Sequence, residues 1–305
     1  MLSKDTIRDW LLTLQENICD EIQEADGGGS FIEDDWERSG GGGGLSRILT
    51  DGKVIEKGGV NFSAVWGKTP EVLLRSMQLD PGDVSEFFAT GVSIVMHPQS
   101  PMVPIIHMNV RYFEMTGEKN IWWFGGGIDL TPHYVIEEDA VYFHERLKQL
   151  CDRHHADYYA EFKKWADDYF YIKHRHETRG VGGIFFDYLK DDENFTKESR
   201  FAFVQDVGKA FVPIYTYFMK KNSSFPYGEK EKRWQHIRRG RYVEFNLVWD
   251  RGTKFGLDTD GRTESILMSL PPQANWMYNY VPAPGTPEEK TLSLLRKGLD
   301  WIQTP

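Results

Sequence analysis

The sequence predicts an α+β fold in which helices pack against a largely antiparallel β-sheet. Extended segments follow one another between residues 59 and 131, and helical periodicity lies on either side of this block. Strands that come in adjacent groups, without regular strand-helix alternation, are typical of antiparallel sheets. The chain has 305 residues, no internal repeat and no sharp break in composition. We therefore expect residues 1–305 to form a single domain.

The first element is an amphipathic helix near the N-terminus, with Ser3, Asp5 and Thr6 available as caps. Its apolar residues recur at intervals of three and four: Ile7, Trp10, Leu11, Leu14, Ile18 and Ile22. Residues 25–45 then contain three glycines at 27–29 and five at 40–44. A flexible linker and a loop that covers a ligand fit this composition equally well.

The central block predicts four strands, because β-branched and aromatic residues are bounded there by turn residues. The expected strands are 60–66, 84–97, 102–114 and 120–131. Two prolines lie in the segment from His97 to Pro101. They predict a hairpin turn between the second and third strands.

The second half of the chain returns to helical spacing between Glu137 and Arg175, where we expect two successive helices. Further elements are predicted in this order: a strand over 181–188, a helix over 196–220 disturbed at Pro213, and strands over 241–251 and 263–270 joined around Asp260 and Gly261. A capping box with proline in the first turn, at Thr286, Pro287 and Glu289, begins the final helix.

The composition excludes several classes of function. Lys and Arg number 36 against 46 Asp and Glu, for a net charge of -10, so the basic footprint of a nucleic-acid-binding protein is missing. Only Cys19 and Cys151 occur, which excludes a disulfide scaffold and a cysteine-based zinc site. No long apolar run or signal peptide is found, so we expect no integral membrane segment and a cytoplasmic location.

Common catalytic motifs are also missing. The glycines at 40–44 lack the Gly-Lys-Ser/Thr of a phosphate loop. His144 has no second histidine four positions on, and His155 with Asp157 lies in a segment whose helical periodicity already explains it. The glycines at 125–127 weaken a strand, and either a flat ligand close to the sheet or a bulge accounts for them.

Strand periodicity gathers polar side chains on one sheet face. His107, Asn109 and Arg111 share a face because residues two apart in a strand point the same way. Ser93 and His97 do the same on the strand expected to be its neighbour, and Asp129 shares a face with Gly125 and Gly127. If these faces coincide, they can bind an anionic ligand and move protons. A solvent-facing side of the sheet is the alternative.

Basic residues cluster in three places, and if they converge they make a clamp for carboxylates or phosphates. Scattered surface positions are the alternative interpretation. The clusters are Lys173, Arg175 and Arg179; Arg238, Arg239 and Arg241; and Arg251 with Arg262.

These segments identify the chain by resemblance. Between about residues 30 and 280 it resembles the oxygen-dependent coproporphyrinogen III oxidases of haem biosynthesis. The resemblance rests on long motifs, among them GGGGGLSRIL (40–49), KGGVNFS (57–63), GVSIVMHP (91–98), HMNVRYF (107–113), WWFGGGIDLTP (122–132), YFYIKHR (169–175), RGVGGIFFD (179–187), RRGRYVEFNLVWDRGTKFG (238–256) and GRTESILMSLP (261–271).

The resemblance implies an enzyme that converts two propionates of coproporphyrinogen III to vinyl groups, giving protoporphyrinogen IX. Dioxygen is the expected electron acceptor, and no organic cofactor is expected. The family's fold is a large, flat, mostly antiparallel seven-stranded sheet with helices on both faces. A homodimer is also implied, with residues 242–277 contributing to the contact. A non-catalytic tetrapyrrole carrier and an iron-dependent oxygenase are the alternatives.

The resemblance also assigns residues. Substrate contacts are expected from Ser93, Asn109, Val110, Arg111 and the turn of Asp260, Gly261 and Arg262. His107 matches a proton donor, Asp129 matches a carboxylate that faces the pyrrole nitrogens and helps to deprotonate them, and Arg111 with Arg262 is expected to hold carboxylates. Metal ligands proposed in bacterial relatives match His97, His107, His144 and His174, although we expect no metal requirement.

One residue departs from the family pattern. Asp260 stands where a small neutral residue is common, which places an acid beside a turn expected to bind carboxylates. The departure favours contact through backbone amides at this turn.

Overall fold

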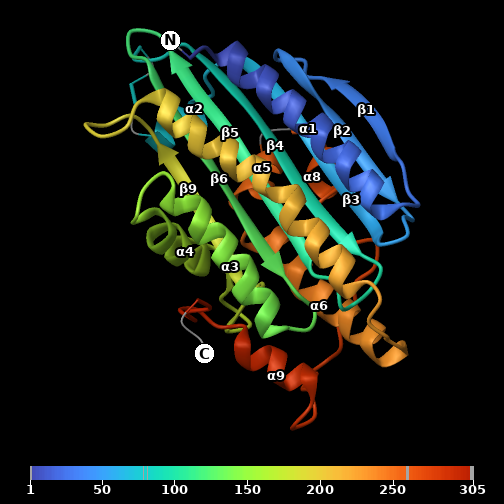
Figure 1. Cartoon of the computed structure of the whole chain (residues 1–305). Helices are drawn as coiled ribbons and strands as arrows, with labels where there is room; N and C mark the ends of the chain where they lie inside the picture. The colour runs from blue at the N-terminus through green and yellow to red at the C-terminus, as the bar shows by residue number, and fades with distance from the viewer. Residues whose placement is uncertain (1, 78, 81, 259–260, 303–305) are drawn as a thin grey trace.

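The structure is a computed structural model that describes residues 2–77, 79–80, 82–258 and 261–302. Its centre is a seven-stranded antiparallel sheet in the order β1-β2-β3-β4-β5-β6-β9 (Figure 1). These strands are β1 (Phe31–Glu37), β2 (Gly42–Thr50), β3 (Ile55–Lys68), β4 (Glu86–Pro98), β5 (Ile105–Thr116), β6 (Ile121–Thr131) and β9 (Gly182–Leu189). The α+β prediction is confirmed.

The remaining elements are a two-stranded hairpin and the helices. The hairpin pairs β7 (Tyr171–Ile172) with β8 (Glu177–Thr178). The helices are α1 (Lys4–Asp26), α2 (Glu71–Met77), α3 (Glu137–Asp152), α4 (Tyr158–Tyr169), α5 (Lys197–Asn222), α6 (Glu229–Val248), α7 (Arg251–Asp258), α8 (Thr263–Leu267) and α9 (Pro287–Leu294).

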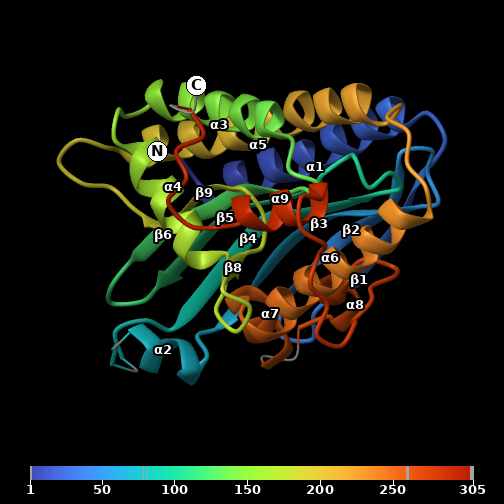
Figure 2. The same cartoon turned by 90° about the horizontal axis from the view of Figure 1, so that it is seen from below.

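Helices lie on both faces of the sheet, as Figure 2 shows. On one face, α1 and α5 pack on the central strands and close the main hydrophobic core. Val92, Met108, Val110 and Ile128 point into that core and are completely buried. The opposite face carries α2, α6, α7 and α8 (Figure 2). The sheet therefore has one closed apolar face and one face that helices cover in part.

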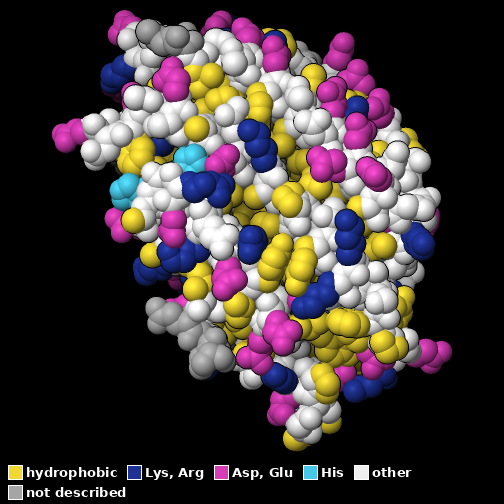
Figure 3. All heavy atoms as spheres, viewed as in Figure 1, with side chains coloured by type: hydrophobic (Ala, Val, Ile, Leu, Met, Phe, Trp, Pro, Cys, Tyr) yellow, Lys and Arg dark blue, Asp and Glu magenta, His cyan; other side chains and the backbone are white. Residues whose placement is uncertain are grey.

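The outer surface of the closed face is mixed in charge. Asp and Glu side chains alternate there with Lys and Arg over α1, α3 and α5, and apolar side chains lie between them (Figure 3). No helix in the described part of the chain is long and apolar enough to cross a membrane.

Helix α1 forms as predicted. Its Ser3 cap accepts a hydrogen bond from the Thr6 amide, and Gly27 ends the helix in the left-handed conformation. The buried Gln15 side chain donates to the carbonyls of Leu45 and Val60, at 2.7 Å each, and so fixes α1 on the sheet. The predicted central strands, the strand near 181–188, the helix containing Pro213 and the final helix are also confirmed. The two helices predicted between 137 and 175 are confirmed as far as Tyr169, after which strand β7 replaces the predicted helix.

Residues 25–45 are neither a linker nor a covering loop. They complete α1 and form the β1–β2 hairpin, whose strands pair from Phe31 with Leu49 to Glu37 with Gly43. Gly41 and Gly42 have φ angles of 115° and 82° at the turn, where a side chain is strained. At Gly42 a Cβ atom would also lie 2.1 Å from the Ala64 carbonyl oxygen. The glycines serve strand pairing at a tight turn.

The strands predicted over 241–251 and 263–270 were wrong, because these segments lie in α6, α7 and α8. The β-branched and aromatic residues after Arg241 suggested a strand. In the structure Trp234, Ile237, Tyr242 and Phe245 are buried at helical spacing, so one stripe of α6 faces the protein interior. Asp260, the predicted joint between the two strands, lies outside the described residues.

Candidate active site

The partly covered sheet face brings the predicted polar residues together in rows. Strand register places Ser93 opposite Asn109, and Asn109 opposite Gly127. Two residues further along the same strands, and on the same face, Gly91 lies opposite Arg111 and Arg111 lies opposite Gly125. The glycines leave this part of the face low and flat. At the far end of the face α6 covers the sheet, and Tyr242 packs there on Val95 and Ile105.

A histidine and a carboxylate from adjacent strands form the centre of the site. His107 Nδ1 lies 2.7 Å from Asp129 Oδ1 across the β5–β6 pair. His107 remains partly exposed, with 21% of its side chain accessible, whereas Asp129 is 2% exposed. Because the carboxylate accepts the Nδ1 proton, Nε2 is the imidazole atom that can serve a ligand.

Arg179 contacts the carboxylate oxygen of Asp129 that His107 leaves free. The guanidinium donates from Nη2 to Asp129 Oδ2 at 2.6 Å and from Nη1 to Asn246 Oδ1 of α6 at 2.9 Å. Its Cζ lies over the rings of Phe170, Tyr242 and Phe245, between 4.3 and 4.8 Å from their centroids. This buried cation is therefore fixed by one ion pair, one amide and three aromatic faces.

The surroundings of Asp129 keep it ionised. Burial alone raises the pKa of this carboxyl, but the charge of Arg179 and the hydrogen bond with His107 outweigh burial, so the pKa lies below its ordinary value. Both oxygens are already engaged by His107 and Arg179. Asp129 is thus placed to act on a ligand through the imidazole of His107.

Arg111 spans three strands of the open face. It donates from Nη1 to Asn109 Oδ1 at 3.0 Å, and its Nη2 lies 2.8 Å from Asp187 Oδ2 on β9. A Cβ atom at Gly125 would lie 2.5 Å from Asp187 Oδ1 and 2.9 Å from Arg111 Cζ. The register of β6 and β9 also shifts between Phe124 and Gly126. Gly125 therefore combines a strand irregularity with the passage of a guanidinium over the strand.

The other predicted substrate contacts are divided between the two faces. Ser93 lies on the open face, half-buried beside Asn109. The Val110 side chain points into the core and is completely buried, so only its backbone faces away from the core. Arg262 precedes α8 and pairs with Asp34 of β1, and Gly261 lies beside α7, donating from its amide to the Gly256 carbonyl at 2.7 Å.

The four histidines matched to metal ligands have other partners. Both ring nitrogens of His144 are engaged, with the Tyr159 hydroxyl and the Val181 carbonyl, each at 2.9 Å. His174 bonds Glu244 and accepts from Trp249, and His97 bonds the Ser269 carbonyl. No group of three or more His, Cys, Asp or Glu among the described residues could hold a metal ion. These side chains do not fit a shared metal site.

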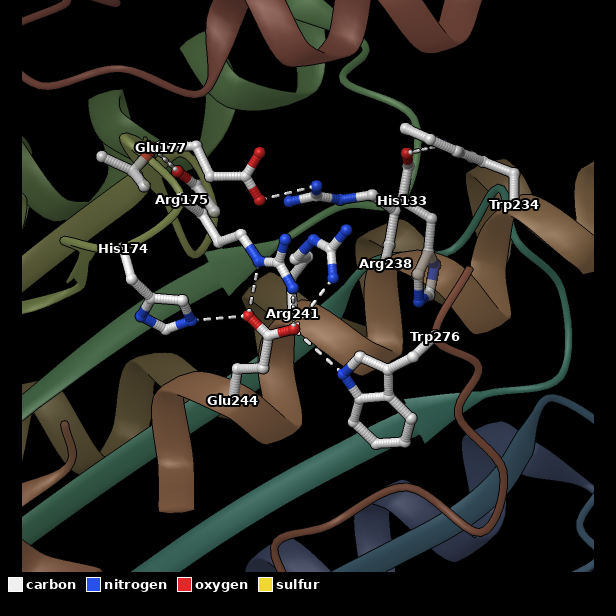
Figure 4. Close-up of polar contacts among 11 residues, drawn as sticks. His133, His174, Arg175, Glu177, Trp234, Arg238, Arg241, Glu244 and Trp276 are labelled. Atoms are coloured by element: carbon white, nitrogen blue, oxygen red, sulfur yellow. Dashed lines mark hydrogen bonds and ion pairs between the residues drawn. The ribbon is translucent and has the colours of Figure 1, made fainter. Parts of the chain in front are cut away.

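Most of the predicted basic clusters are paired within the protein. Figure 4 shows one such network, in which several donors point toward the Glu244 carboxylate and Arg238 pairs with Glu177 beside it. The donors to Glu244 are His174, Arg175, Arg241 and Trp276. Arg239 is completely buried and pairs with Glu56. Of these clusters, Arg179 and Arg262 therefore connect directly to the open face.

Three contributors were missed by the sequence analysis. Asp187, Asn246 and Asp34 contact Arg111, Arg179 and Arg262, respectively. Asp187 could have been found, because it ends a predicted strand with the two-residue alternation of Gly183 and Phe185. Asn246 and Asp34 lie in segments that were not predicted as a helix and a strand, so no sequence signal placed them at the site.

Comparisons with known proteins identify the family of the chain. The family model described as coproporphyrinogen III oxidase matches residues 6–301. A relative named coproporphyrinogen-III oxidase 1, chloroplastic, from Arabidopsis thaliana, is 49% identical over 299 residues, which cover 94% of this chain and 76% of the relative. Both matches extend over almost the whole chain and over every strand of the open face. The chain therefore belongs to the coproporphyrinogen III oxidase family.

Proposed function

We propose that this chain catalyses the oxygen-dependent oxidative decarboxylation of two propionates of coproporphyrinogen III to vinyl groups, giving protoporphyrinogen IX. The observation that carries the proposal is the His107–Asp129 pair on a flat, glycine-lined face beside Arg111, in a chain of this family. The face suits a broad macrocycle, and the arginine suits its acid side chains.

The proposed reaction balances with dioxygen as the only oxidant. Each propionate, with one proton and one dioxygen, gives one vinyl group, one carbon dioxide and one hydrogen peroxide. In the first step the pyrrole loses its N–H proton and its ring carbon bonds dioxygen. The resulting peroxide removes a proton from the propionate carbon next to the ring, and hydroperoxide leaves. Loss of carbon dioxide completes the vinyl group and returns an electron pair to the ring, and the pyrrole nitrogen then takes up one proton from solvent. We propose no organic cofactor and no metal requirement.

The roles of the side chains follow from their positions. His107 Nε2 accepts the pyrrole proton, and the ring later protonates the departing hydroperoxide. Asp129 orients the imidazole and stabilises its charged form, supported by the fixed charge of Arg179. Arg111, held by Asn109 and Asp187, binds a propionate beside the reacting ring, and Arg262 binds another. Ser93, Asn109, Gly261 and the backbone of Val110 line the same site.

An oxygen-electrode assay tests the reaction. The purified chain is mixed with coproporphyrinogen III under subdued light, with and without a chelator. Oxygen uptake with formation of protoporphyrinogen IX, unaffected by the chelator, is the expected result. Substrate binding without oxygen uptake supports a carrier instead. Activity that the chelator abolishes and iron restores supports an iron-dependent oxygenase.

We also propose a homodimer in which residues 242–277 contribute to the contact. Large apolar side chains are exposed along the end of α6, along α7 and in the segment after Met268: Leu247, Val248, Phe255, Leu257 and Trp276. Patches of this kind mark protein interfaces. Light scattering should give twice the chain mass, and Leu247→Asp should shift the equilibrium toward the monomer. A monomeric unmodified chain would contradict the dimer.

For the compartment we propose the cytoplasm, which rests on the sequence expectation alone. The Arabidopsis relative is named chloroplastic, and that name describes the relative. Fractionation of the source cells, with detection of the native chain, decides between these locations.

A further inference from the structure

Both arginines proposed to bind propionates already hold a carboxylate of the chain itself. Arg111 pairs with Asp187 and Arg262 pairs with Asp34. These two ion pairs differ in how firmly they are built. Arg111 is also bonded to Asn109 and passes over Gly125, which has no room for a side chain. The Arg111–Asp187 pair is therefore a fixed part of the site.

The Asp34–Arg262 pair is more open. The difference lies at the carboxylate: the Asp34 side chain is 43% exposed against 21% for Asp187, whereas Arg262 at 27% is less exposed than Arg111 at 35%. Nη1 of Arg262 is buried and has no hydrogen-bond partner in the described part of the chain. A buried guanidinium nitrogen without an acceptor is costly, so this end of Arg262 is suited to a further carboxylate oxygen.

Asp34 lies in line with the proposed substrate contacts. Strand register runs from Asp34 to Ser46, Asn61, Ser93 and Asn109, so these five side chains share the open face. Asp34 is thus one end of a polar row whose other end, Asn109, lies two residues from His107 on β5. A carboxylate at this position is attached to the edge strand β1, which pairs on one side only with β2.

Arg262 itself is held in place independently of Asp34. Helix α8 follows it directly and is bonded to the sheet, because Asn61 Nδ2 donates to the Ser265 carbonyl at 2.7 Å. The Ser265 and Ser46 hydroxyls also lie 2.9 Å apart. Loss of the Asp34 charge therefore leaves the base of Arg262 in position over the sheet.

We propose that Asp34 is an exchangeable placeholder, a carboxylate that occupies Arg262 until a substrate propionate replaces it. Asp34 weakens the binding of a tetracarboxylate, because the ion pair between Asp34 and Arg262 has to break first. In the free protein it keeps the guanidinium aligned and its charge balanced. The inference rests on the proposed function, since it takes Arg262 as a propionate-binding residue.

The test compares Asp34→Asn with Asp35→Asn, a matched control. Asp35 adjoins Asp34 on β1, is exposed, and points to the opposite face, so both variants remove one negative charge from the same strand. The probe is coproporphyrin III, the oxidised macrocycle with the same four propionates, and its Kd is measured by quenching of tryptophan fluorescence. Asp34→Asn should bind the probe about two- to fivefold more tightly, the range expected for release of an exposed ion pair.

Steady-state kinetics and a double variant complete the test. With coproporphyrinogen III, Asp34→Asn should lower KM and leave kcat within about twofold, whereas Asp35→Asn should change neither. In an Arg262→Ala background the effect of Asp34→Asn on the probe Kd should disappear. Unchanged or weaker binding by Asp34→Asn overturns the placeholder while leaving the proposed function intact. Unchanged binding by Arg262→Ala instead removes the arginine from the proposed site.

Discussion

At the scale of single residues, the pairing of Asp129 bears on which group moves the proton in the proposed reaction. A free carboxylate facing the substrate could act as a base directly. Here the carboxylate is buried, ionised, and bonded at both oxygens, so we expect the partly exposed His107 to be the group that reaches the ligand in the proposed reaction. This division resembles other sites in which a buried acid orients an imidazole that performs the transfer.

Replacement of Asp129 separates chemistry from stability only if the shape of the side chain is kept. Asp129→Ala leaves the buried Arg179 unpaired and should lower the free energy of unfolding by about 3 to 5 kcal/mol. Asp129→Asn keeps the shape of the side chain and one of the two acceptor oxygens, and it should lower kcat by about 100-fold or more, the range for loss of acid-base assistance. Oxygen uptake and urea unfolding measure the two effects. Substantial residual activity of a folded Asp129→Asn protein would remove the residue from the mechanism.

Arg111 is expected to act in binding more than in chemistry. Arg111→Ala should raise KM about tenfold or more, because a charge-assisted bond to a propionate contributes roughly 1.5 to 3 kcal/mol. Gly125→Ala should weaken binding in the same direction, because the added Cβ displaces Arg111 from Asp187. Initial rates over a range of coproporphyrinogen III concentrations check both variants. An unchanged KM in Arg111→Ala would contradict its role as a propionate ligand.

At the scale of elements, α6 is joined to the β7–β8 hairpin through the Glu244 network. Burial raises the pKa of Glu244, but hydrogen bonds from Arg175 and His174 outweigh it and lower the pKa to about 2. A carboxyl with a depressed pKa stabilises the fold at pH values above its unfolded pKa of about 4.3. That stabilisation is lost as the pH falls from there through about 2.

Glu244→Gln should therefore lower the free energy of unfolding by about 1 to 3 kcal/mol at pH 7, after allowance for solvent screening. The difference from the unmodified chain should shrink below pH 4.3. Urea unfolding at pH 7 and at pH 3.5 measures it. Glu161→Gln, at an exposed position on α4, is the control and should have little effect at either pH. If Glu244→Gln and Glu161→Gln lowered the free energy of unfolding equally, the Glu244 network would not be what holds the hairpin.

Elements also show how far the sequence could lead. The strands from β3 to β6 were predictable because their β-branched residues alternate between a buried face and a polar face. The β1–β2 hairpin was not, because its glycines and acidic residues have low strand propensity and pairing with β3 decides their conformation. Helix α6 was mistaken in part for a strand because the β-branched and aromatic residues after Arg241 have high strand propensity. In the structure they pack at helical spacing, a tertiary effect that propensity does not contain.

The site residues that lie on the predicted strands could also be predicted from the sequence. His107, Asn109 and Arg111 were placed on one face by alternation within one strand, and Asp129 joined them through strand pairing. Their partners Arg179 and Asn246 come from a turn and from α6, so only the folded chain brings them to Asp129. Asp260 lies outside the described residues, and its part in the site stays a prediction.

At the scale of the whole molecule, three buried histidines make the fold sensitive to acid. Burial lowers the pKa of His97, His133 and His144, with nearby arginines adding to the effect for the first two, and His144 falls to about 3. At pH values just below 6.5 these imidazoles are therefore neutral in the folded state and protonated in the unfolded state. The free energy of unfolding is therefore at its full value above the unfolded pKa of about 6.5 and declines as the pH falls below it.

Each of these histidines should lower the free energy of unfolding by about 1.4 kcal/mol for every pH unit below 6.5. Together the three should lower it by about 4 kcal/mol per unit. Urea unfolding at pH 7.5 and pH 5.5 measures the decline. His144→Phe should remove about a third of that slope, whereas His155→Gln, at an exposed position, should leave it unchanged. An unfolding free energy that does not change over this interval would show that these side chains are charged in the native state.

The position of Arg179 has a consequence for inherited or engineered changes elsewhere in the chain. Tyr242, Phe245 and Asn246, which enclose it, lie on the same helix as Glu244, which binds the β7–β8 hairpin. A lesion in the hairpin that tilts this helix would loosen the enclosure and weaken the charge that holds Asp129. Such a protein could fold and still take up its pigment precursor, yet oxidise it slowly, and the fault would lie far from any atom the pigment touches.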